Sequence, residues 1–138
     1  MLKKIVIAYD GSDPSKKALD YAFDLADKYS AQLMVLSVVR IPEVPDDVET
    51  EAIIDEASDS LQREFDKMKS TFAGKKIEAS FEIRVGHPAD QIVSFADETK
   101  ADLIVMGHRG RTDISRWLLG SISKRVMSYA HCSVFLVR

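Results

Sequence analysis

Residues 4–39 read KIVIAYDGSDPSKKALDYAFDLADKYSAQLMVLSVV and settle the class of fold. Apolar runs at residues 4–9 and 32–39 have the length of single strands. Between them, apolar residues recur at spacings of three and four, which places them on one face of a helix: Ala18, Leu19, Ala22, Phe23, Ala26 and Tyr29. A strand, a helix and a strand in this order predict two parallel strands joined by a right-handed crossover.

The alternation of strand and helix continues to the end of the chain. Further apolar runs occupy residues 77–85, 102–106 and 133–137, and each has strand length. Three more helical stripes lie between the runs: Ala57, Leu61, Phe65, Met68 and Phe72; Ala89, Ile92, Val93 and Ala96; Leu118, Leu119, Ile122, Val126 and Ala130. We therefore expect one α/β domain over residues 1–138, an open parallel five-stranded sheet with helices on both faces.

The third of these five runs differs from the others. In residues 77–85 apolar and polar side chains alternate, whereas the other four runs are continuously apolar. A strand that is covered on both faces is apolar throughout, and alternation leaves one face to water. We therefore place residues 77–85 at an edge of the sheet.

The composition limits the classes of function. Hydrophobic residues make up 46% and charged residues 30% of the chain, so we expect it to fold rather than to stay disordered. Nineteen Lys and Arg against 22 Asp and Glu leave a net charge of −3, which argues against a general nucleic-acid or anionic-membrane binder. The single Cys132 excludes an internal disulfide and a thiolate-rich metal site. No apolar run has the length of a signal peptide or a membrane span, so we expect a cytoplasmic protein.

The charges are distributed unevenly. An acidic segment begins in a predicted loop at residues 41–47 and is opposed only by Arg63; its acids are Glu43, Asp46, Asp47, Glu49, Glu51, Asp55, Glu56, Asp59, Glu64 and Asp66. We interpret this segment as the solvated face of the second helix, with an acidic docking face for a partner as the alternative. The chain is locally basic at residues 109–125, through Arg109, Arg111, Arg116, Lys124 and Arg125.

The first predicted strand leads into Asp10-Gly11-Ser12-Asp13-Pro14. Ligands of open parallel sheets bind beyond the carboxyl ends of the strands, so residues placed there are candidates for a site. Gly11 suits a sharp turn. Ser12 or Asp13 can cap a helix, and Pro14 suits its first turn. Asp10 is left over: its carboxylate fits a ribose hydroxyl, a ligand amine or a hydrated Mg²⁺, or it binds neighbouring backbone amides.

The fourth predicted strand leads into residues 107–123, GHRGRTDISRWLLGSIS. Gly107 and Gly110 allow the backbone to approach a ligand closely. Gly120 opens a helical pattern, and a helix N-terminus with no side chain in the way favours an anion. Ser121 and Ser123 add hydroxyl donors for phosphate oxygens. The same glycines also suit turns and helix capping, so phosphate binding and pure architecture are both open at this point.

Other binding motifs are absent. The chain has no Gly-Lys-[Ser/Thr] of a P-loop at Gly120 and no G-x-G-x-x-G after the first strand. His87, His108 and His131 share no metal-ligand spacing. Cys132 is interpreted as a small buried residue rather than an activated thiolate.

Gly107, Gly110, Gly120 and Ser121 have the spacing Gly-2x-Gly-9x-Gly-Ser, which resembles the ATP-binding signature of the universal stress protein family. Residues 3–12, 101–107 and 132–138 resemble the first, fourth and closing strands of that family, in the same order. The resemblance covers essentially the whole chain. One departure is visible before the closing strand, where the family often has Pro and this chain has Ser133.

The resemblance implies a Rossmann-like sheet of the adenine nucleotide alpha hydrolase type, in strand order 3-2-1-4-5. It implies a site for ATP, or for AMP, ADP or cyclic AMP, with Mg²⁺ as an optional companion. At the matching positions, Ala8 and Val38 would frame the adenine. Asp10 would contact the ribose or an indirectly held Mg²⁺, Met106 and Gly107 would line the ribose, and Arg109 and Gly110 would form the loop over it. The phosphates would be held by Gly120, Ser121, Ile122 and Ser123. It also implies a homodimer through the C-terminal strand, residues 133–138.

The leading hypothesis is an ATP-binding regulatory protein of the stress response. One alternative is a slow Mg-dependent ATPase or phosphotransferase, and another is a nucleotide-free dimeric interaction module. No residue stands out as a general base beside the expected γ-phosphate, so we expect weak hydrolysis at most.

Overall fold

The computed structural model describes residues 1–41, 47–110 and 119–138. Its helices and strands alternate in the predicted order: β1 (Lys4–Ala8), α1 (Asp13–Tyr29), β2 (Gln32–Val39), α2 (Asp47–Phe72), β3 (Ala79–Val85), α3 (Pro88–Thr99), β4 (Leu103–Gly107), α4 (Ser121–Tyr129) and β5 (Ser133–Val137). Several residues used in the sequence analysis lie outside the described ranges: Glu43, Asp46, Arg111, Arg116 and Leu118.

The five strands form one parallel sheet in the order β3-β2-β1-β4-β5, which confirms the expected fold class and strand order. β1 lies at the centre, where Ile5 is in register with Leu33 of β2 and with Leu103 of β4. The chain moves outward from β1 through β2 to β3, then returns to β4 on the other side. Such a reversal beside the central strand is where open α/β sheets hold their ligands.

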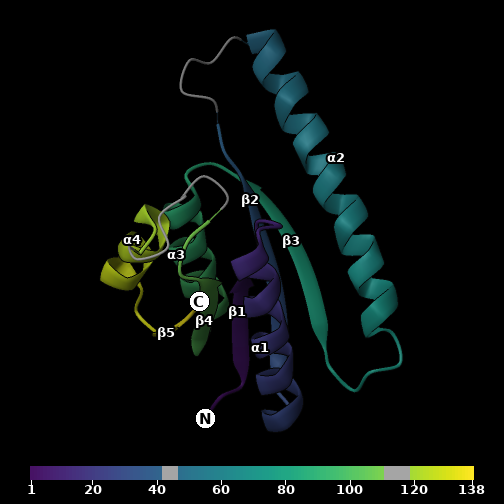
Figure 1. Ribbon diagram of the computed structural model, residues 1–138, viewed down its shortest axis with the longest axis vertical. Coiled ribbons are helices and arrows are strands. Elements are labelled where there is room, and N and C mark those ends of the chain that lie inside the picture. Colours follow the sequence, from purple (N-terminus) through teal and green to yellow (C-terminus); the bar gives the residue numbers. More distant parts are fainter. Residues whose placement is uncertain (42–46, 111–118) are drawn as a thin grey trace.

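Helices cover both faces of the sheet (Figure 1). Side chains alternate along a strand, so Ile5 and Ile7 point to the face that carries α1 and α2, while Val6 points to the face of α3 and α4. All three side chains are fully buried. Full burial of an aliphatic side chain of this size contributes roughly 1.5–3 kcal/mol, and these two layers form the core.

β3 is an edge strand, as its alternating sequence predicted. Its outward residues Ser80 and Glu82 are exposed, and Phe81 between them is half-buried. The strand begins at Ala79, two residues later than predicted. Ala79 is in register with Leu33, and β2 begins at Gln32, so Ile77 has no strand to pair with.

Ser12 is the residue that caps α1. Its hydroxyl oxygen accepts a hydrogen bond from the Ser15 N–H at 3.3 Å, and Pro14 lies in the first turn of the helix. This local geometry agrees with the sequence, because a Ser cap satisfies one of the free N–H groups of a helix start. The turn also brings Asp10 to the carboxyl end of β1.

α2 has 26 residues and is about 39 Å long at 1.5 Å per residue. Phe65, in its C-terminal half, is 1% exposed and packs in the core, together with Met68 and Phe72. The N-terminal half continues beyond the carboxyl ends of the strands (Figure 1), and Ile53 there is 53% exposed. Among the described residues, no helix combines the length and the apolar character that crossing a bilayer requires.

Candidate functional site

A cleft of about 440 Å³ opens at the carboxyl edge of the sheet. Its floor and walls come from the ends of β1, β2 and β4, the segment after β4, the N-terminus of α4, and one face of α2. A volume of this size fits a small molecule of nucleotide or drug size. The lining residues include all eleven that the sequence analysis selected: Ala8, Asp10, Val38, Met106, Gly107, Arg109, Gly110, Gly120, Ser121, Ile122 and Ser123.

Asp10 stands at the tip of β1 with an exposed side chain. Its Oδ1 accepts a hydrogen bond from the Ser12 N–H at 2.9 Å, so the backbone-amide alternative holds for one oxygen. Its Oδ2 faces Gly110, where an added Cβ would lie only 2.8 Å away. Gly110 therefore leaves room for this carboxylate at the mouth of the cleft.

The segment after β4 is tied to the rest of the sheet by backbone hydrogen bonds. His108 N–H donates to the Val137 carbonyl at 2.8 Å, and Gly120 N–H donates to the His108 carbonyl at 2.8 Å. Gly107 is needed for packing, because a Cβ there would lie 2.7 Å from the Pro14 Cβ. These contacts hold the two glycine-bearing segments of the motif side by side, nine residues apart in sequence.

Ser123 has a different role from the one expected for it. Its side chain is buried, and its hydroxyl is within 3.0 Å of the carbonyl oxygens of both Gly107 and His108. One hydroxyl proton is shared between these two acceptors, so the group fastens α4 to the end of β4. The Ser123 hydroxyl, which was expected to contact phosphate, therefore makes structural hydrogen bonds instead. The backbone N–H of Ser123, in the first turn of α4, is the group that could still donate to a phosphate.

The N-terminus of α4 opens into the cleft. Gly120 precedes the helix in an extended conformation, with φ −62° and ψ 153°, and it offers no side-chain cap. The first N–H groups of a helix have no intrahelical partner, and together with the helix dipole they favour an anion. Ser121, at the first helical position, adds an exposed hydroxyl. This end of the cleft thus suits a phosphate group.

One wall of the cleft was missed by the sequence analysis. α2 contributes five residues at spacings of four, three, one and three, which is a single helix face: Ile53, Ala57, Ser60, Leu61 and Glu64. The sequence contained a signal for this wall, because the apolar stripe of the helix continues from Phe65 toward the N-terminus through Leu61 and Ala57. The period of the stripe could not reveal the wall, because a stripe that packs on a sheet and a stripe that faces a ligand have the same period.

Two side chains in the cleft carry buried polar atoms without hydrogen-bond partners. These atoms are Oε2 of Glu64 and Nε of Arg109. The sequence analysis grouped Glu64 with the solvated acids of α2, and the structure corrects this: Glu64 is part of the cleft wall. Buried polar atoms are nearly always paired in folded proteins, so an unpaired atom beside a cleft calls for an explanation.

The donor set for a metal ion in the cleft is small. In the described part of the chain, no group of three or more His, Cys, Asp or Glu side chains is placed to hold a metal. Asp10 is the carboxylate at the β1 tip. Mg²⁺ commonly keeps several waters and binds one or two carboxylates plus ligand phosphates. Asp10 fits that role, with the ligand supplying the other oxygens.

Cys132 is half-buried and packs against the core on the α3 and α4 side. Burial raises the pKa of its thiol, which keeps it protonated near neutral pH. This agrees with the interpretation of Cys132 as a small packing residue. His108 is also buried, with Nδ1 3.2 Å from the Val137 carbonyl oxygen.

These observations define a Rossmann-like α/β protein with a small-molecule cleft at its topological switch point. Residues 1–138 match the model of the universal stress protein family, and the chain belongs to that family. It is 37% identical to a universal stress protein of Methanocaldococcus jannaschii, over all of this chain and 83% of that protein. It is 35% identical to one of Bacillus subtilis over the full length of both.

Solved structures of universal stress proteins share the fold. UspA from Lactobacillus plantarum superposes with a TM-score of 0.91 at 24% identity, covering 99% of this chain and 98% of that one. A universal stress protein in complex with cAMP is 27% identical, with a TM-score of 0.66 over 99% and 97% of the two chains. A third, from Archaeoglobus fulgidus in complex with dAMP, is 25% identical, with a TM-score of 0.68 over the full length of both.

Proposed function

We propose that the cleft binds ATP or a related adenine nucleotide, and that the chain is a nucleotide-dependent regulatory protein of the stress response. The observation that carries this proposal is the combination of two unlike ends in one cleft. Apolar side chains of Leu36, Val38 and Ile92 line it, and the N-terminus of α4 opens into it. A flat apolar base and an anionic phosphate need these two environments.

The phosphates are assigned to the α4 end. Backbone N–H groups of Ser121, Ile122 and Ser123 lie in the first turn, where no earlier carbonyl of the helix can accept from them. Ser121 supplies the remaining hydroxyl. The adjacent segment brings Arg109, whose Nε is buried without a partner and gains one from an anionic ligand.

Support also comes from relatives, whose structures include one in complex with cAMP and one in complex with dAMP. Both ligands carry adenine and a single phosphate. We extend this to ATP on the basis of the Gly-2x-Gly-9x-Gly-Ser spacing, which joins Gly107 and Gly110 to Gly120 and Ser121. Asp10 is the residue that would hold a Mg²⁺ ion that accompanies ATP, indirectly through water.

Slow hydrolysis is the second candidate, and it rests on Asp10 at the mouth of the cleft. It predicts phosphate release that is lost in Asp10→Asn while ATP binding survives. Release at the rate of buffer alone, in a protein that binds ATP tightly, discards this candidate.

We also propose a homodimer through residues 133–138. β5 is the other edge of the sheet, and Val134, Phe135 and Leu136 in it are only half-buried. An apolar edge strand is prone to pair with a second copy. Gel filtration is expected to give twice the chain mass, and a monomer at high micromolar concentration contradicts the dimer.

The nucleotide proposal is tested by thermal unfolding with and without ligand. A ligand that binds only the folded state at 100 times its Kd stabilises it by roughly 2.7 kcal/mol, so Tm is expected to rise with ATP. Gly120→Val should abolish the shift, because it places a branched side chain at the phosphate end. The backbone angles of Gly120 are ones that Val adopts readily, so the substitution should not strain the backbone.

A matched control is Ser128→Val, in the exposed last turn of the same helix and outside the cleft. It should keep the full ligand-induced shift. No shift in wild type at millimolar ATP, ADP, AMP or cyclic AMP contradicts the nucleotide proposal and leaves the nucleotide-free interaction module. Normal binding by Gly120→Val contradicts the assignment of the phosphates to α4.

A further inference from the structure

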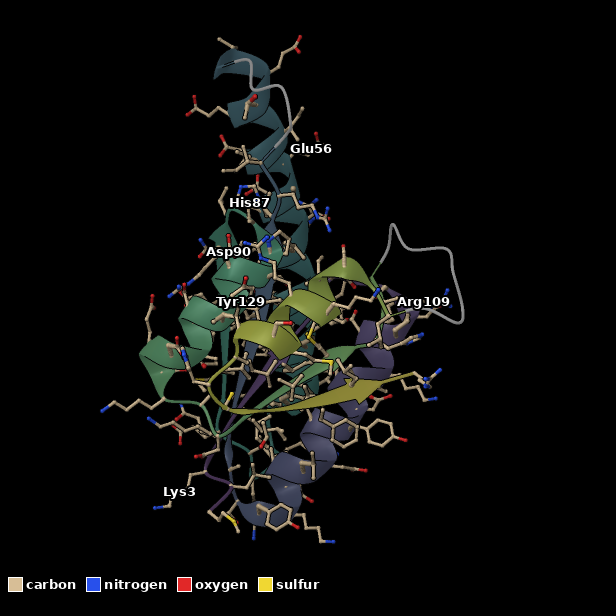
Figure 2. The ribbon with its side chains drawn as sticks, turned by 90° about the vertical axis from the view of Figure 1, so that its left-hand side faces the viewer. Lys3, Glu56, His87, Asp90, Arg109 and Tyr129 are labelled. Carbon is tan, nitrogen blue, oxygen red and sulfur yellow. The ribbon has the colours of Figure 1, made fainter. Side chains whose placement is uncertain are left out.

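Glu64 is set apart from the other acids of α2 by its surroundings. It belongs to the face of the helix that lines the cleft, next to Ser60 and Leu61. Its Oε2 is covered by protein and has no hydrogen-bond partner. By contrast Glu56, two turns earlier, is exposed and outside the cleft; Figure 2 shows it on the upper part of α2.

A carboxylate oxygen that is removed from water without a donor destabilises the folded state. No Lys or Arg in the described part of the chain forms an ion pair with Glu64, so the described residues supply no compensation for this charge. The terminal torsion of a Glu side chain is broad, so a partial rotation of the carboxylate can turn Oε2 from its covered position toward the cleft that Glu64 lines. Glu64 is thus a preformed acceptor that lacks a donor, at a place where a ligand can bring one.

We propose that Glu64 is a specificity-determining residue that accepts a hydrogen bond from the exocyclic amino group of a bound base. This inference rests on the proposed function. A carboxylate repels phosphate, so the phosphate end of a nucleotide is not its partner. The ribose is assigned to Asp10. The cleft-lining face of α2 that carries Glu64 also carries Leu61, about one turn earlier, and Ala57 and Ile53 farther toward the N-terminus, which are apolar side chains that suit a base.

An acceptor that cannot donate discriminates between 6-amino and 6-oxo purines. The amino group of adenine donates to the carboxylate, whereas the oxygen at the same position of hypoxanthine faces the carboxylate with like polarity and cannot pair with it. AMP and IMP are the appropriate probes, because they have the same ribose and phosphate and differ at the ring edge. The site is therefore expected to prefer AMP.

The experiment is isothermal titration of the full chain with AMP and with IMP. Wild type is expected to bind AMP about tenfold or more tightly than IMP, the size of one hydrogen bond to a charged group. In Glu64→Gln the ratio should fall to within about threefold, because the side-chain amide can donate to the 6-oxo group as well as accept. Glu56→Gln, the same change on the exposed face of α2, should keep the wild-type ratio.

The outcomes separate the inference from the proposed function. Failure of wild type to bind either nucleotide overturns both. Equal affinities of wild type for AMP and IMP overturn the inference alone, as does an unchanged ratio in Glu64→Gln. The inference is also overturned if Glu64→Gln keeps the AMP-to-IMP affinity ratio but no longer discriminates between AMP and 2′-deoxy-AMP. That result would assign Glu64 to the ribose instead of the base.

Titrations of the wild-type chain alone test the inference even if Glu64→Gln does not fold. AMP methylated twice at its 6-amino group keeps the ring and loses both donor hydrogens. Wild type is expected to bind it at least about tenfold more weakly than AMP. Full affinity for the dimethylated ligand overturns the inference without any variant.

Discussion

The two halves of α2 present the same apolar face to different surroundings. In the C-terminal half, Phe65 is 1% exposed and packs with Phe81 of β3 at a ring-centroid distance of 5.2 Å. In the N-terminal half, Ile53 is 53% exposed and lines the cleft. The sheet ends between them (Figure 1), so the stripe belongs to the core around Phe65 and lines the cleft farther toward the N-terminus of the helix. The period of an apolar stripe therefore does not by itself show whether its residues pack in the core or line a cleft.

The largest loss of stability is expected from a substitution in the C-terminal half of this stripe. Phe65→Ala removes a fully buried ring and leaves a cavity, which should lower the free energy of unfolding by about 3–5 kcal/mol. Urea denaturation followed by circular dichroism measures this change. A loss under about 1 kcal/mol would show that α2 is not packed on the sheet as described.

Gly107 lies where the sheet ends, and its substitution should have the next largest effect. The Cβ of Gly107→Ala would lie 2.7 Å from the Pro14 Cβ and 3.1 Å from the Pro14 carbonyl carbon. Such overpacking against a backbone costs typically about 1–3 kcal/mol. Denaturation by urea should show this loss of stability, and unchanged stability would remove the packing reason for a glycine at the end of β4.

In the upper half of α2 the expected effect shifts from stability to binding. Ile53→Ala should change the free energy of unfolding by at most about 0.5 kcal/mol, since the side chain is half exposed. It should weaken nucleotide affinity about three- to tenfold, because it removes apolar surface that a bound base covers. Val48→Ala, also apolar and exposed on α2 but outside the cleft, is the control and should change neither. Equal affinities of wild type and Ile53→Ala would exclude α2 from the site.

The fold followed from the sequence more completely than the site did. Alternating polarity placed β3 at an edge, and the helix cap was narrowed to Ser12 or Asp13, of which the structure selects Ser12, because both features depend on local chemistry. Glu64 was grouped with solvated acids, since helix periodicity does not show where a sheet ends beneath a helix. The hydroxyl of Ser123 was assigned to a ligand, yet its acceptors are carbonyls 15 and 16 residues earlier, which only the tertiary fold brings near.

The smallest effect is expected at the end of the sheet where the strands begin, on the opposite side from the cleft. The N-terminal half of α2 does not reach this end of the sheet. Lys3 lies at that end, far from Glu56 (Figure 2). Oδ2 of Asp102 accepts hydrogen bonds there from the N–H groups of Lys3 and Lys4 at 2.8 and 2.9 Å. These two donors hold the pKa of Asp102 below its usual range.

The sign of the pH dependence follows from that lowered pKa. The contribution of Asp102 is fully present above the unfolded-state pKa of about 3.9 and is lost as the pH falls through the lower folded-state value. Its size is below about 1 kcal/mol, because the carboxylate is exposed and screened. Asp102→Asn should flatten the stability profile below pH 4. Parallel profiles for Asp102→Asn and wild type would contradict this assignment, and nucleotide affinity at pH 7 should be equal in both.

The most direct test of the proposed nucleotide binding is a titration of the wild-type chain with ATP and AMP beside the Gly120→Val variant, at concentrations up to the millimolar range. The proposal predicts saturable binding of one nucleotide per chain in wild type and none in Gly120→Val, with both proteins folded. Absence of saturable binding in wild type, or equal binding by both proteins, would contradict it.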